Sequence, residues 1–219
     1  MKISRLQYIT QENKQSGHLD CVENACEAGC DWVQLRVKNR PDEQYLKMAR
    51  TALALCKKAG SKLIINDNVS VAKEIRADGV HLGKDDMPPG EARKILGSDF
   101  IIGATANTFE DLEKSVDAGV DYIGLGPFRY TNTKERLSPI LGLEGFHKII
   151  HQTQMAGIDI PVIAIGGILT ENIEPIMQTG IYGIAVSGLI THATDPKKTV
   201  SFIKEKLRNA TLTSSRQNL

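Results

Sequence analysis

The chain has 219 residues, of which 41% are hydrophobic and 24% charged, and its 27 Lys and Arg against 26 Asp and Glu give a formal net charge of +1. This length allows one sizeable hydrophobic core, and the balanced charge excludes a general electrostatic attraction to nucleic acid or to a membrane surface. The longest apolar runs, such as IPVIAIGGI, are far shorter than the roughly 20 residues of a membrane-spanning helix, and the first residues lack the apolar region of a signal peptide, so we expect a cytoplasmic protein.

Eight short runs rich in β-branched residues alternate with amphipathic segments, and each run predicts a strand. In chain order the runs lie at 5–10, 31–36, 62–66, 78–82, 100–105, 121–126, 161–167 and 183–188. Between them, segments such as 43–60 carry apolar residues at three-to-four spacing and predict helices, here with Gly60 as the C-terminal stop. The alternation of strand and helix is typical of an α/β protein with a parallel sheet.

Eight such units predict a single-domain TIM (β/α)8 barrel over residues 1–208, with a doubly wound sheet as the alternative. Near the end of the chain, Asp195 is suited to be the N-cap of the last helix and Pro196 its first residue. Residues 209–219 have little to bury, and we predict a disordered C-terminal tail there.

Metal-binding patterns of cysteine and histidine are weak in this sequence. The cysteines are Cys21, Cys26, Cys30 and Cys56, and they form no CxxC pair. Reduced thiols on or under helices are therefore favoured over a zinc site or disulfides. His147 and His151 have the spacing of a zinc-binding helix but lack the Glu of HExxH, so an exposed helix face is expected.

Polar residues follow most of the predicted strands, at the ends where TIM barrels carry their active sites. Gln34, Arg36 and Lys38 occupy alternate positions at the end of the second strand, so we expect their side chains to point together toward the barrel axis or its mouth. Because buried cations are costly without an anion, these three residues predict a bound anion, with a structural salt-bridge cluster as the alternative.

The third and fourth strands end in acidic and amide residues. Asn66, Asp67 and Asn68 follow one strand, and Asp85 and Asp86 follow the next; all are also ordinary turn residues. Adjacent strand ends that each supply a carboxylate can hold Mg²⁺ together with water and phosphate oxygens. Combined with the cations after the second strand, they predict a magnesium-bound pyrophosphate, with Asp67 as the better placed first ligand.

Hydroxyl and amide groups follow the fifth and sixth strands. Thr105 and Asn107 are suited to orient a polar ligand, whereas Thr108 is expected to cap the next helix. The sixth strand leads into GPFRYTNTK, whose glycine and proline predict a sharp turn. Beyond this turn, Thr131, Thr133 and Lys134 offer donors suited to phosphate.

Glycine-rich turns follow the seventh and eighth strands, where many TIM barrels bind a phosphate through backbone N–H groups. Gly166, Gly167, Ser187 and Gly188 fit such a second anion site, although the glycines also serve tight turns in their own right. Two anion sites in one barrel mouth predict that two phosphorylated small molecules meet between them.

The ordered segments VQLRVK, IINDN, GVHLGKDD, IGATANT, GLGPFRYTNTK, IPVIAIGGI and IAVSGL cover most of the chain, which thereby closely resembles the thiamine-phosphate synthase family. The resemblance implies a TIM-barrel transferase that joins 4-amino-2-methyl-5-hydroxymethylpyrimidine diphosphate (the pyrimidine diphosphate) to 4-methyl-5-(2-phosphoethyl)thiazole (the thiazole phosphate), releasing pyrophosphate and forming thiamine phosphate. It further implies Mg²⁺ as cofactor, phosphorylated small molecules as partners, neither nucleic acid nor membrane binding, and a homo-oligomer.

The resemblance also implies roles for individual residues. Contacts to the pyrimidine diphosphate would come from Gln34, Arg36, Lys38, Asn66, Thr105 and Lys134. Three of these, Arg36, Lys38 and Lys134, would act in catalysis by neutralising the leaving pyrophosphate. Mg²⁺ would be held by Asp67 and Asp86. Contacts to the thiazole phosphate would come from Thr131, Asn132, Thr133, Gly167, Val186 and Ser187. The chain differs from the family pattern in having Thr105 where Ser is frequent and Tyr130 where Pro is frequent.

Two other functions fit parts of the same pattern. A related thiazole tautomerase uses a histidine base just after the fifth strand, where this chain has Asn107. A non-catalytic barrel that senses thiamine phosphates would need no intact magnesium pair. Retention of the basic and acidic residues for a diphosphate favours the synthase over both, and the absence of a convincing Ser-His or Cys-His pair agrees with chemistry that needs no protein nucleophile.

Overall fold

The computed structural model describes residues 3–130 and 139–217, and the side chains of the last helix as far as residue 210. Four residues that the sequence assigns to the site, Thr131, Asn132, Thr133 and Lys134, therefore lie outside the described residues.

Eight parallel strands form a closed barrel in chain order, which confirms the predicted TIM barrel and excludes the doubly wound sheet. The strands are β1 (Leu6–Ile9), β2 (Trp32–Leu35), β3 (Lys62–Asn66), β4 (Gly79–Leu82), β5 (Ile101–Ala106), β6 (Tyr122–Leu125), β7 (Val162–Ile165) and β8 (Gly183–Val186). The barrel closes where β1 pairs with β8, with Tyr8 opposite Val186. Every predicted strand is present within two residues of its expected bounds.

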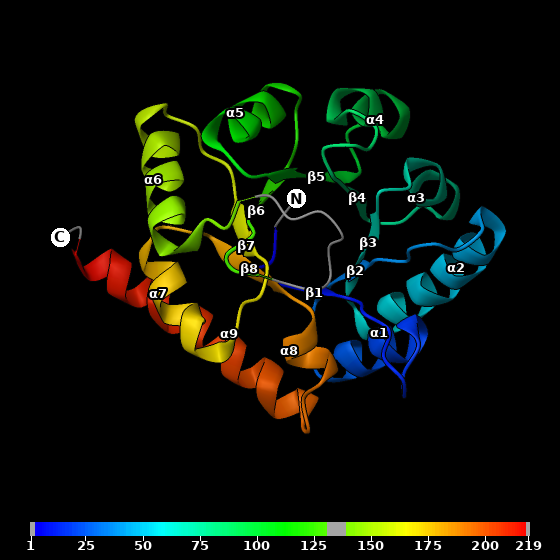
Figure 1. Cartoon of the computed structure of the whole chain (residues 1–219). Coiled ribbons are helices and arrows are strands. Elements are labelled where there is room, and N and C mark those ends of the chain that lie inside the picture. Colours follow the sequence, from blue (N-terminus) through cyan, green and yellow to red (C-terminus); the bar gives the residue numbers. More distant parts are fainter. Residues whose placement is uncertain (1–2, 131–138, 218–219) are drawn as a thin grey trace.

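Helices surround the strands in chain order (Figure 1). They are α1 (His18–Glu27), α2 (Asp42–Ala59), α3 (Val69–Ile75), α4 (Pro89–Leu96), α5 (Phe109–Asp117), α6 (Gly142–Met155), α7 (Ile173–Gln178) after a 3₁₀ turn η1 (Thr170–Asn172), α8 (Gly188–Thr191) and α9 (Pro196–Gln217). The predicted helix signals are confirmed: Gly60 is left-handed with φ 70° after α2, and the Thr108 side chain accepts the Asp111 N–H at the start of α5. Asp195 likewise accepts the Lys198 N–H at 3.0 Å at the start of α9.

The last helix is longer than the sequence analysis predicts. α9 continues through Gln217, so most of the segment expected to be a disordered tail is helical. The physical reason is that neither glycine nor proline follows Pro196, so nothing in the local sequence ends the helix.

Alternation along the strands divides the buried side chains into two layers. The larger layer lies between the strands and the helices. The smaller one fills the barrel and consists of Ile3, Ile9, Trp32, Ile64, Ile101, Tyr122, Ile163 and Ala185. Polar side chains at other inward positions of the strands are buried as well, among them Gln7, Gln34 and His81. Burying polar groups is costly unless they are hydrogen-bonded, so these inward polar side chains need hydrogen-bond partners inside the barrel.

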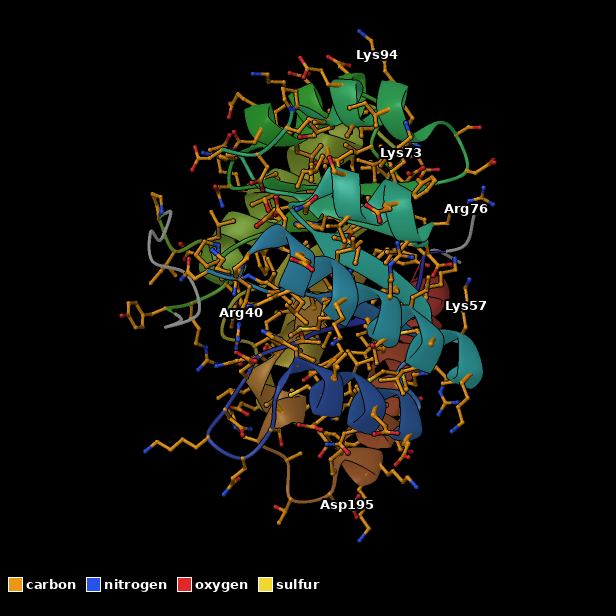
Figure 2. All side chains as sticks on the ribbon, turned by 90° about the vertical axis from the view of Figure 1, so that its right-hand side faces the viewer. Arg40, Lys57, Lys73, Arg76, Lys94 and Asp195 are labelled. Atoms are coloured by element: carbon orange, nitrogen blue, oxygen red, sulfur yellow. The ribbon has the colours of Figure 1, made fainter. Side chains whose placement is uncertain are left out.

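The two ends of the barrel are distinct. In Figure 2, Arg40, which follows β2, lies on the opposite side from Lys57 and Arg76, which stand at the C-terminal ends of α2 and α3. The strands therefore all present their carboxyl ends on the side of Arg40. Among the helices that the structure describes, none has the length and apolar character needed to cross a membrane.

The cysteines and histidines lie where the sequence analysis expects them. All four cysteines are buried free thiols, and the Cys26 and Cys56 sulfurs lie 3.9 Å apart. His147 and His151 lie on the exposed face of α6.

Candidate active site

The barrel has a hollow at each end. A cavity of about 570 Å³ lies at the amino ends of the strands, and its wall includes Arg5, Asp31 and Lys62. A second hollow of about 380 Å³ lies at the carboxyl ends and includes Asn66 and Asp67. Although the first is larger, it holds none of the residues selected from the sequence, and TIM-barrel enzymes place their chemistry at the carboxyl ends. We therefore place the candidate site at the second hollow.

The basic residues after β2 approach this site, but not as the strand geometry predicts. Only Gln34 lies within β2, which ends at Leu35, and Arg36 and Lys38 belong to the loop beyond it. The prediction that all three alternate along one strand is therefore wrong, because the chain leaves the barrel before the second of them. Both cations nevertheless act on Asp67, since their charges lower the pKa of its carboxyl group. The loop, rather than the strand, delivers them.

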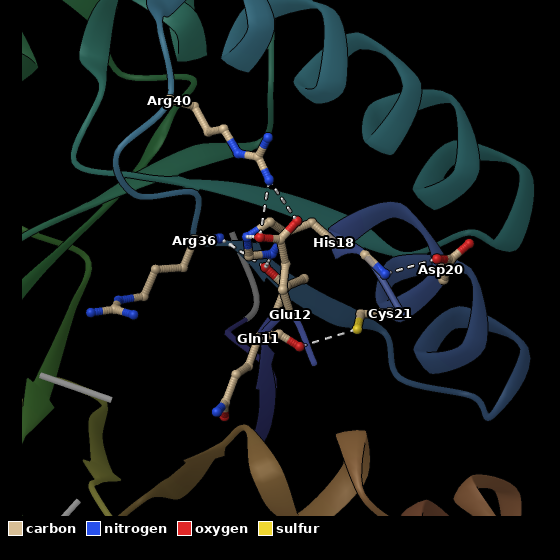
Figure 3. Close-up of polar contacts among 9 residues, drawn as sticks. Gln11, Glu12, His18, Asp20, Cys21, Arg36 and Arg40 are labelled. Carbon is tan, nitrogen blue, oxygen red and sulfur yellow. Dashed lines mark hydrogen bonds and ion pairs between the residues drawn. The ribbon is translucent and has the colours of Figure 1, made fainter. Parts of the chain in front are cut away.

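The backbone of Arg36 is fixed by residues that the sequence analysis does not select. The Thr10 hydroxyl accepts the Arg36 N–H at 3.0 Å and bonds to Nδ1 of His18, a buried residue of α1, at 2.9 Å. Beside them, Glu12 pairs with Arg40 at 3.3 Å. Figure 3 shows the Arg36 guanidinium pointing away from this ion pair. The arrangement holds the loop at its base while Arg36 extends away from Glu12.

Asp67 is held in an unusual backbone conformation at the carboxyl end of β3. Its φ of 65° is left-handed, and its N–H donates to the carbonyl of His81 in β4 at 2.8 Å. The next residue, Asn68, caps α3 by accepting the Val71 N–H. The hydroxyl of Tyr45 in α2 lies 3.1 Å from the Leu35 carbonyl and 3.0 Å from the Asn66 carbonyl. Tyr45 thereby connects the ends of β2 and β3. Asp67 thus lies at a turn fixed on both sides.

Asp67 and Asp86 form a carboxyl pair. The pKa of Asp67 is raised to about 7, first by burial and then by its hydrogen bond with Asp86 and the charge of that residue, against the opposing charges of Lys38 and Arg36. The Asp86 carboxylate also accepts the Gly83 N–H at 2.6 Å, which fixes its direction. The neighbouring Asp85 is exposed. The structure therefore brings Asp67 together with Asp86, as the family resemblance implies.

The carboxyl pair has the chemistry of a site for a hard divalent cation. Two oxygen-donor side chains lie close enough to share a proton, and a divalent ion between them would offset the burial and the repulsion that raise the pKa of Asp67. No group of three or more His, Cys, Asp or Glu residues within 3–130 and 139–217 is arranged to hold a metal. An ion at Asp67 and Asp86 would thus take most of its ligands from water and substrate, as Mg²⁺ commonly does.

The amide and hydroxyl residues near this pair have different surroundings. Asn66 is buried at the end of β3, and half-buried Thr105 in β5 bonds through its hydroxyl to Nε2 of His81 at 3.0 Å. Asn107, in contrast, is buried and donates its amide N–H to the carbonyl of Gly126. The suggestion that Asn107 orients a ligand is therefore not favoured, because its amide joins the ends of β5 and β6.

The second predicted anion site is built around the loop after β6. Gly166 and Gly167 have φ of 101° and 68°, and a Cβ on them would lie 2.7 Å from the Pro127 Cβ and 2.5 Å from the Arg129 Cγ. The presence of glycine at these two positions therefore has a structural explanation, because a larger residue would collide with the loop after β6. At the end of β8, Val186 packs its side chain in the outer core, while the half-buried Ser187 donates to Oε1 of Gln11 at 3.1 Å.

Several polar residues around the site are not among those selected from the sequence. Gln7, His81 and Tyr122 lie inside predicted strands, Thr10 is the last residue of the first predicted strand, and Gln11 and His18 follow it. The available signal was a polar side chain at an inward position of a strand, as in LQYI and GVHL.

Charged residues at the carboxyl ends of a closed eight-stranded parallel barrel define the class as a TIM-barrel enzyme. Residues 6–190 match the model of the family described as "Thiamine monophosphate synthase". The chain belongs to this family, and it is a transferase of thiamine biosynthesis.

Individual relatives are similar to this protein over nearly the whole chain. A thiamine-phosphate synthase of Flavobacterium johnsoniae is 50% identical over 204 residues, which cover 93% of this chain and 96% of the relative. One of Bacteroides fragilis is 52% identical over 191 residues, covering 87% and 94%. The solved thiamine phosphate pyrophosphorylase of Pyrococcus furiosus has a TM-score of 0.82 at 31% identity and covers 94% of this chain and 96% of that one.

Proposed function

We propose that this transferase joins the pyrimidine diphosphate to the thiazole phosphate in a Mg²⁺-dependent reaction that forms thiamine phosphate and pyrophosphate. The observation that carries the proposal is the Asp67 and Asp86 carboxyl pair at adjacent strand ends, with the charges of Arg36 and Lys38 acting on it. Cations beside a pair of carboxylates fit a diphosphate that is bound together with a divalent ion.

In this proposal the basic residues bind the leaving group. Arg36 and Lys38 contact the diphosphate of the first substrate, and Lys134 adds a third positive charge. Asp67 and Asp86 would hold Mg²⁺, which would supply further neutralisation of the leaving pyrophosphate. The aminopyrimidine stabilises the cation that forms when the carbon–oxygen bond breaks, and the thiazole nitrogen attacks that carbon.

The remaining residues position the two substrates. Gln34, Asn66 and Thr105 line the pyrimidine pocket. The thiazole phosphate is bound by Thr131, Asn132, Thr133, Gly167, Val186 and Ser187. Val186 acts through its backbone, because its side chain is packed in the outer core. Holding both reactants in contact can contribute up to about 7–11 kcal/mol, so no protein nucleophile is required.

The test is product identification with both phosphorylated substrates and Mg²⁺. We expect equimolar pyrophosphate and thiamine phosphate, measured by chromatography with mass detection, and no product when Mg²⁺ is removed with a chelator. Isomerisation of a thiazole carboxylate phosphate without use of the pyrimidine would instead establish a tautomerase. That outcome is disfavoured because the Asn107 amide is bonded to the Gly126 carbonyl and provides no base. Binding of both substrates without turnover would indicate a sensor.

Binding of the divalent ion is expected to weaken as the pH falls below neutrality. Because the pKa of Asp67 is raised to about 7, its carboxyl group is mostly protonated at pH 6 and mostly ionised at pH 8. A proton and a cation compete for the same oxygens, so the dissociation constant should rise about tenfold from pH 8 to pH 6. Electron paramagnetic resonance of Mn²⁺, used in place of Mg²⁺ on the substrate-free protein, measures this directly. An equal affinity at both pH values would contradict the assignment of Asp67 as a ligand.

A further inference from the structure

A continuous chain of hydrogen bonds crosses the barrel interior beneath the proposed site. Nε2 of Gln34 donates to Oε1 of Gln7 at 3.5 Å, and Nε2 of Gln7 donates to the Tyr122 hydroxyl at 3.3 Å. The same hydroxyl lies 2.9 Å from Nδ1 of His81, whose Nε2 lies 3.0 Å from the Thr105 hydroxyl. Five polar side chains from β1, β2, β4, β5 and β6 are thus connected. The two residues at the ends of this series of hydrogen bonds, Gln34 and Thr105, are proposed contacts of the pyrimidine diphosphate.

We propose that Tyr122 and His81 are positioning residues, which orient the Thr105 hydroxyl so that it donates a hydrogen bond to an acceptor atom of the pyrimidine diphosphate. This inference rests on the proposed function, because it concerns the pocket of that substrate.

The proposal assigns a direction to each hydrogen bond. The Tyr122 oxygen accepts from Gln7, and we assign its single hydrogen to the bond with Nδ1 of His81. A neutral imidazole that accepts at Nδ1 carries its hydrogen on Nε2 and donates it to the Thr105 oxygen. The hydroxyl hydrogen of Thr105 is then directed away from His81. This series of hydrogen bonds therefore leaves the Thr105 hydroxyl free to donate its hydrogen to a ligand.

The strands are built to make room for these two rings. A Cβ on Gly103 would lie 2.1 Å from Cζ of Tyr122, and a Cβ on Gly124 would lie 2.9 Å from Cε1 of His81. Both glycines lie inside strands, where glycine is unfavourable unless another group needs the space. The Tyr122 ring is wholly buried and packs edge-on against Trp32, with ring centroids 4.8 Å apart. The rings thus have one well-defined position.

The network also lies directly under the carboxyl pair. His81 is opposite Asn66 on one side and Gly103 on the other, and its carbonyl accepts the Asp67 N–H at 2.8 Å. One residue therefore contacts Thr105 through its side chain and Asp67 through its backbone. This location is expected of a group that positions the ligand-binding residues, and it is not required for a polar contact that only stabilises the barrel.

The experiment compares the affinity of variants for the pyrimidine diphosphate by calorimetry with Mg²⁺ present and the thiazole phosphate absent, so that no product forms. Tyr122→Phe removes one oxygen and keeps the ring. We expect its dissociation constant to rise roughly 5- to 30-fold, as for loss of one well-placed hydrogen bond, with thiazole phosphate affinity unchanged. Tyr182→Phe is the matched control, because its hydroxyl donates to the Ile3 carbonyl at the opposite end of the barrel, and it should bind as wild type does.

A double-mutant comparison separates positioning from general stabilisation. Thr105→Val removes the hydroxyl that the network orients, and Thr105→Ser restores it. If Tyr122 acts through Thr105, adding Tyr122→Phe to Thr105→Val should weaken binding no further, whereas adding it to Thr105→Ser should weaken it as in wild type. A full additional loss in the Thr105→Val background would overturn the inference.

A second measurement needs no variant. Nitrogen-15 NMR of the wild-type protein should show His81 neutral with its hydrogen on Nε2, and a hydrogen on Nδ1 would overturn the inference whatever the variants do. If wild type fails to bind the pyrimidine diphosphate, both the proposed function and this inference are overturned. If wild type binds and Tyr122→Phe binds equally well, only this inference is overturned.

Discussion

Replacing Asp67 by asparagine is expected to reduce the rate of thiamine phosphate formation on the order of 10²–10³-fold, because a bound metal supplies several kcal/mol of charge stabilisation and each 1.36 kcal/mol or so is a factor of ten. Asparagine is the appropriate substitute, since it tolerates the left-handed φ of 65° at this position and alanine does so less well. Steady-state kinetics at saturating substrates and Mg²⁺ measure the effect.

The stability of Asp67→Asn should move in the opposite direction. The folded pKa of Asp67 lies above its unfolded value, so the metal-free wild type loses stability as the pH rises from about 4 through about 7. Asparagine does not titrate, so the variant should unfold at a temperature equal to or above that of wild type at pH 8, measured by calorimetry without metal.

Asp85→Asn is the control, because Asp85 is an exposed neighbour of Asp86, and it should leave both rate and stability unchanged. A loss of folding in Asp67→Asn that parallels its loss of activity would indicate a structural role instead.

Replacing Arg36 by methionine should lower kcat/KM for the pyrimidine diphosphate by roughly 10²-fold or more, because a charge-assisted and potentially bidentate contact to the leaving group is lost. Arg36→Lys should recover only part of the loss, since an ammonium cannot reproduce the guanidinium fork. The KM for the thiazole phosphate should stay close to that of wild type.

The Arg36 variant should also change the pH dependence of activity. The charge of Arg36 lowers the pKa of Asp67, so its removal should raise that pKa and shift the acid limb of the rate profile to higher pH. Arg40→Met provides the matched control, because Arg40 is exposed and pairs with Glu12 at 3.3 Å. Equal effects of the two substitutions would indicate that general positive charge, and not the position of Arg36, matters.

The fold could be predicted almost completely from local patterns. Each strand of the barrel is a short β-branched run between amphipathic segments, and caps such as Thr108 and Asp195 obey rules that involve only neighbouring residues. The extent of α9 could not be predicted in this way, because a polar sequence without glycine or proline is compatible with either a helix or a disordered tail.

The site was less predictable, because its geometry depends on contacts between distant segments. The pairing of Asp67 with Asp86 required the family resemblance to choose between two adjacent aspartates. The fixing of Arg36 by Thr10 depends on a residue 26 positions away. The network through Tyr122 and His81 depends on strand register, which decides which side chains face one another inside the barrel.

Closure of the barrel by β1 and β8 has a consequence for synthesis of the protein in the cell. Until the ribosome has released β8, the first strand lacks one of its two neighbours, and the growing sheet keeps two open edges that invite pairing with other chains. At typical translation speeds this exposed period lasts on the order of ten seconds. A prematurely terminated polypeptide is therefore an aggregation hazard and not a partially active catalyst, because Ser187 follows the very strand that completes the ring.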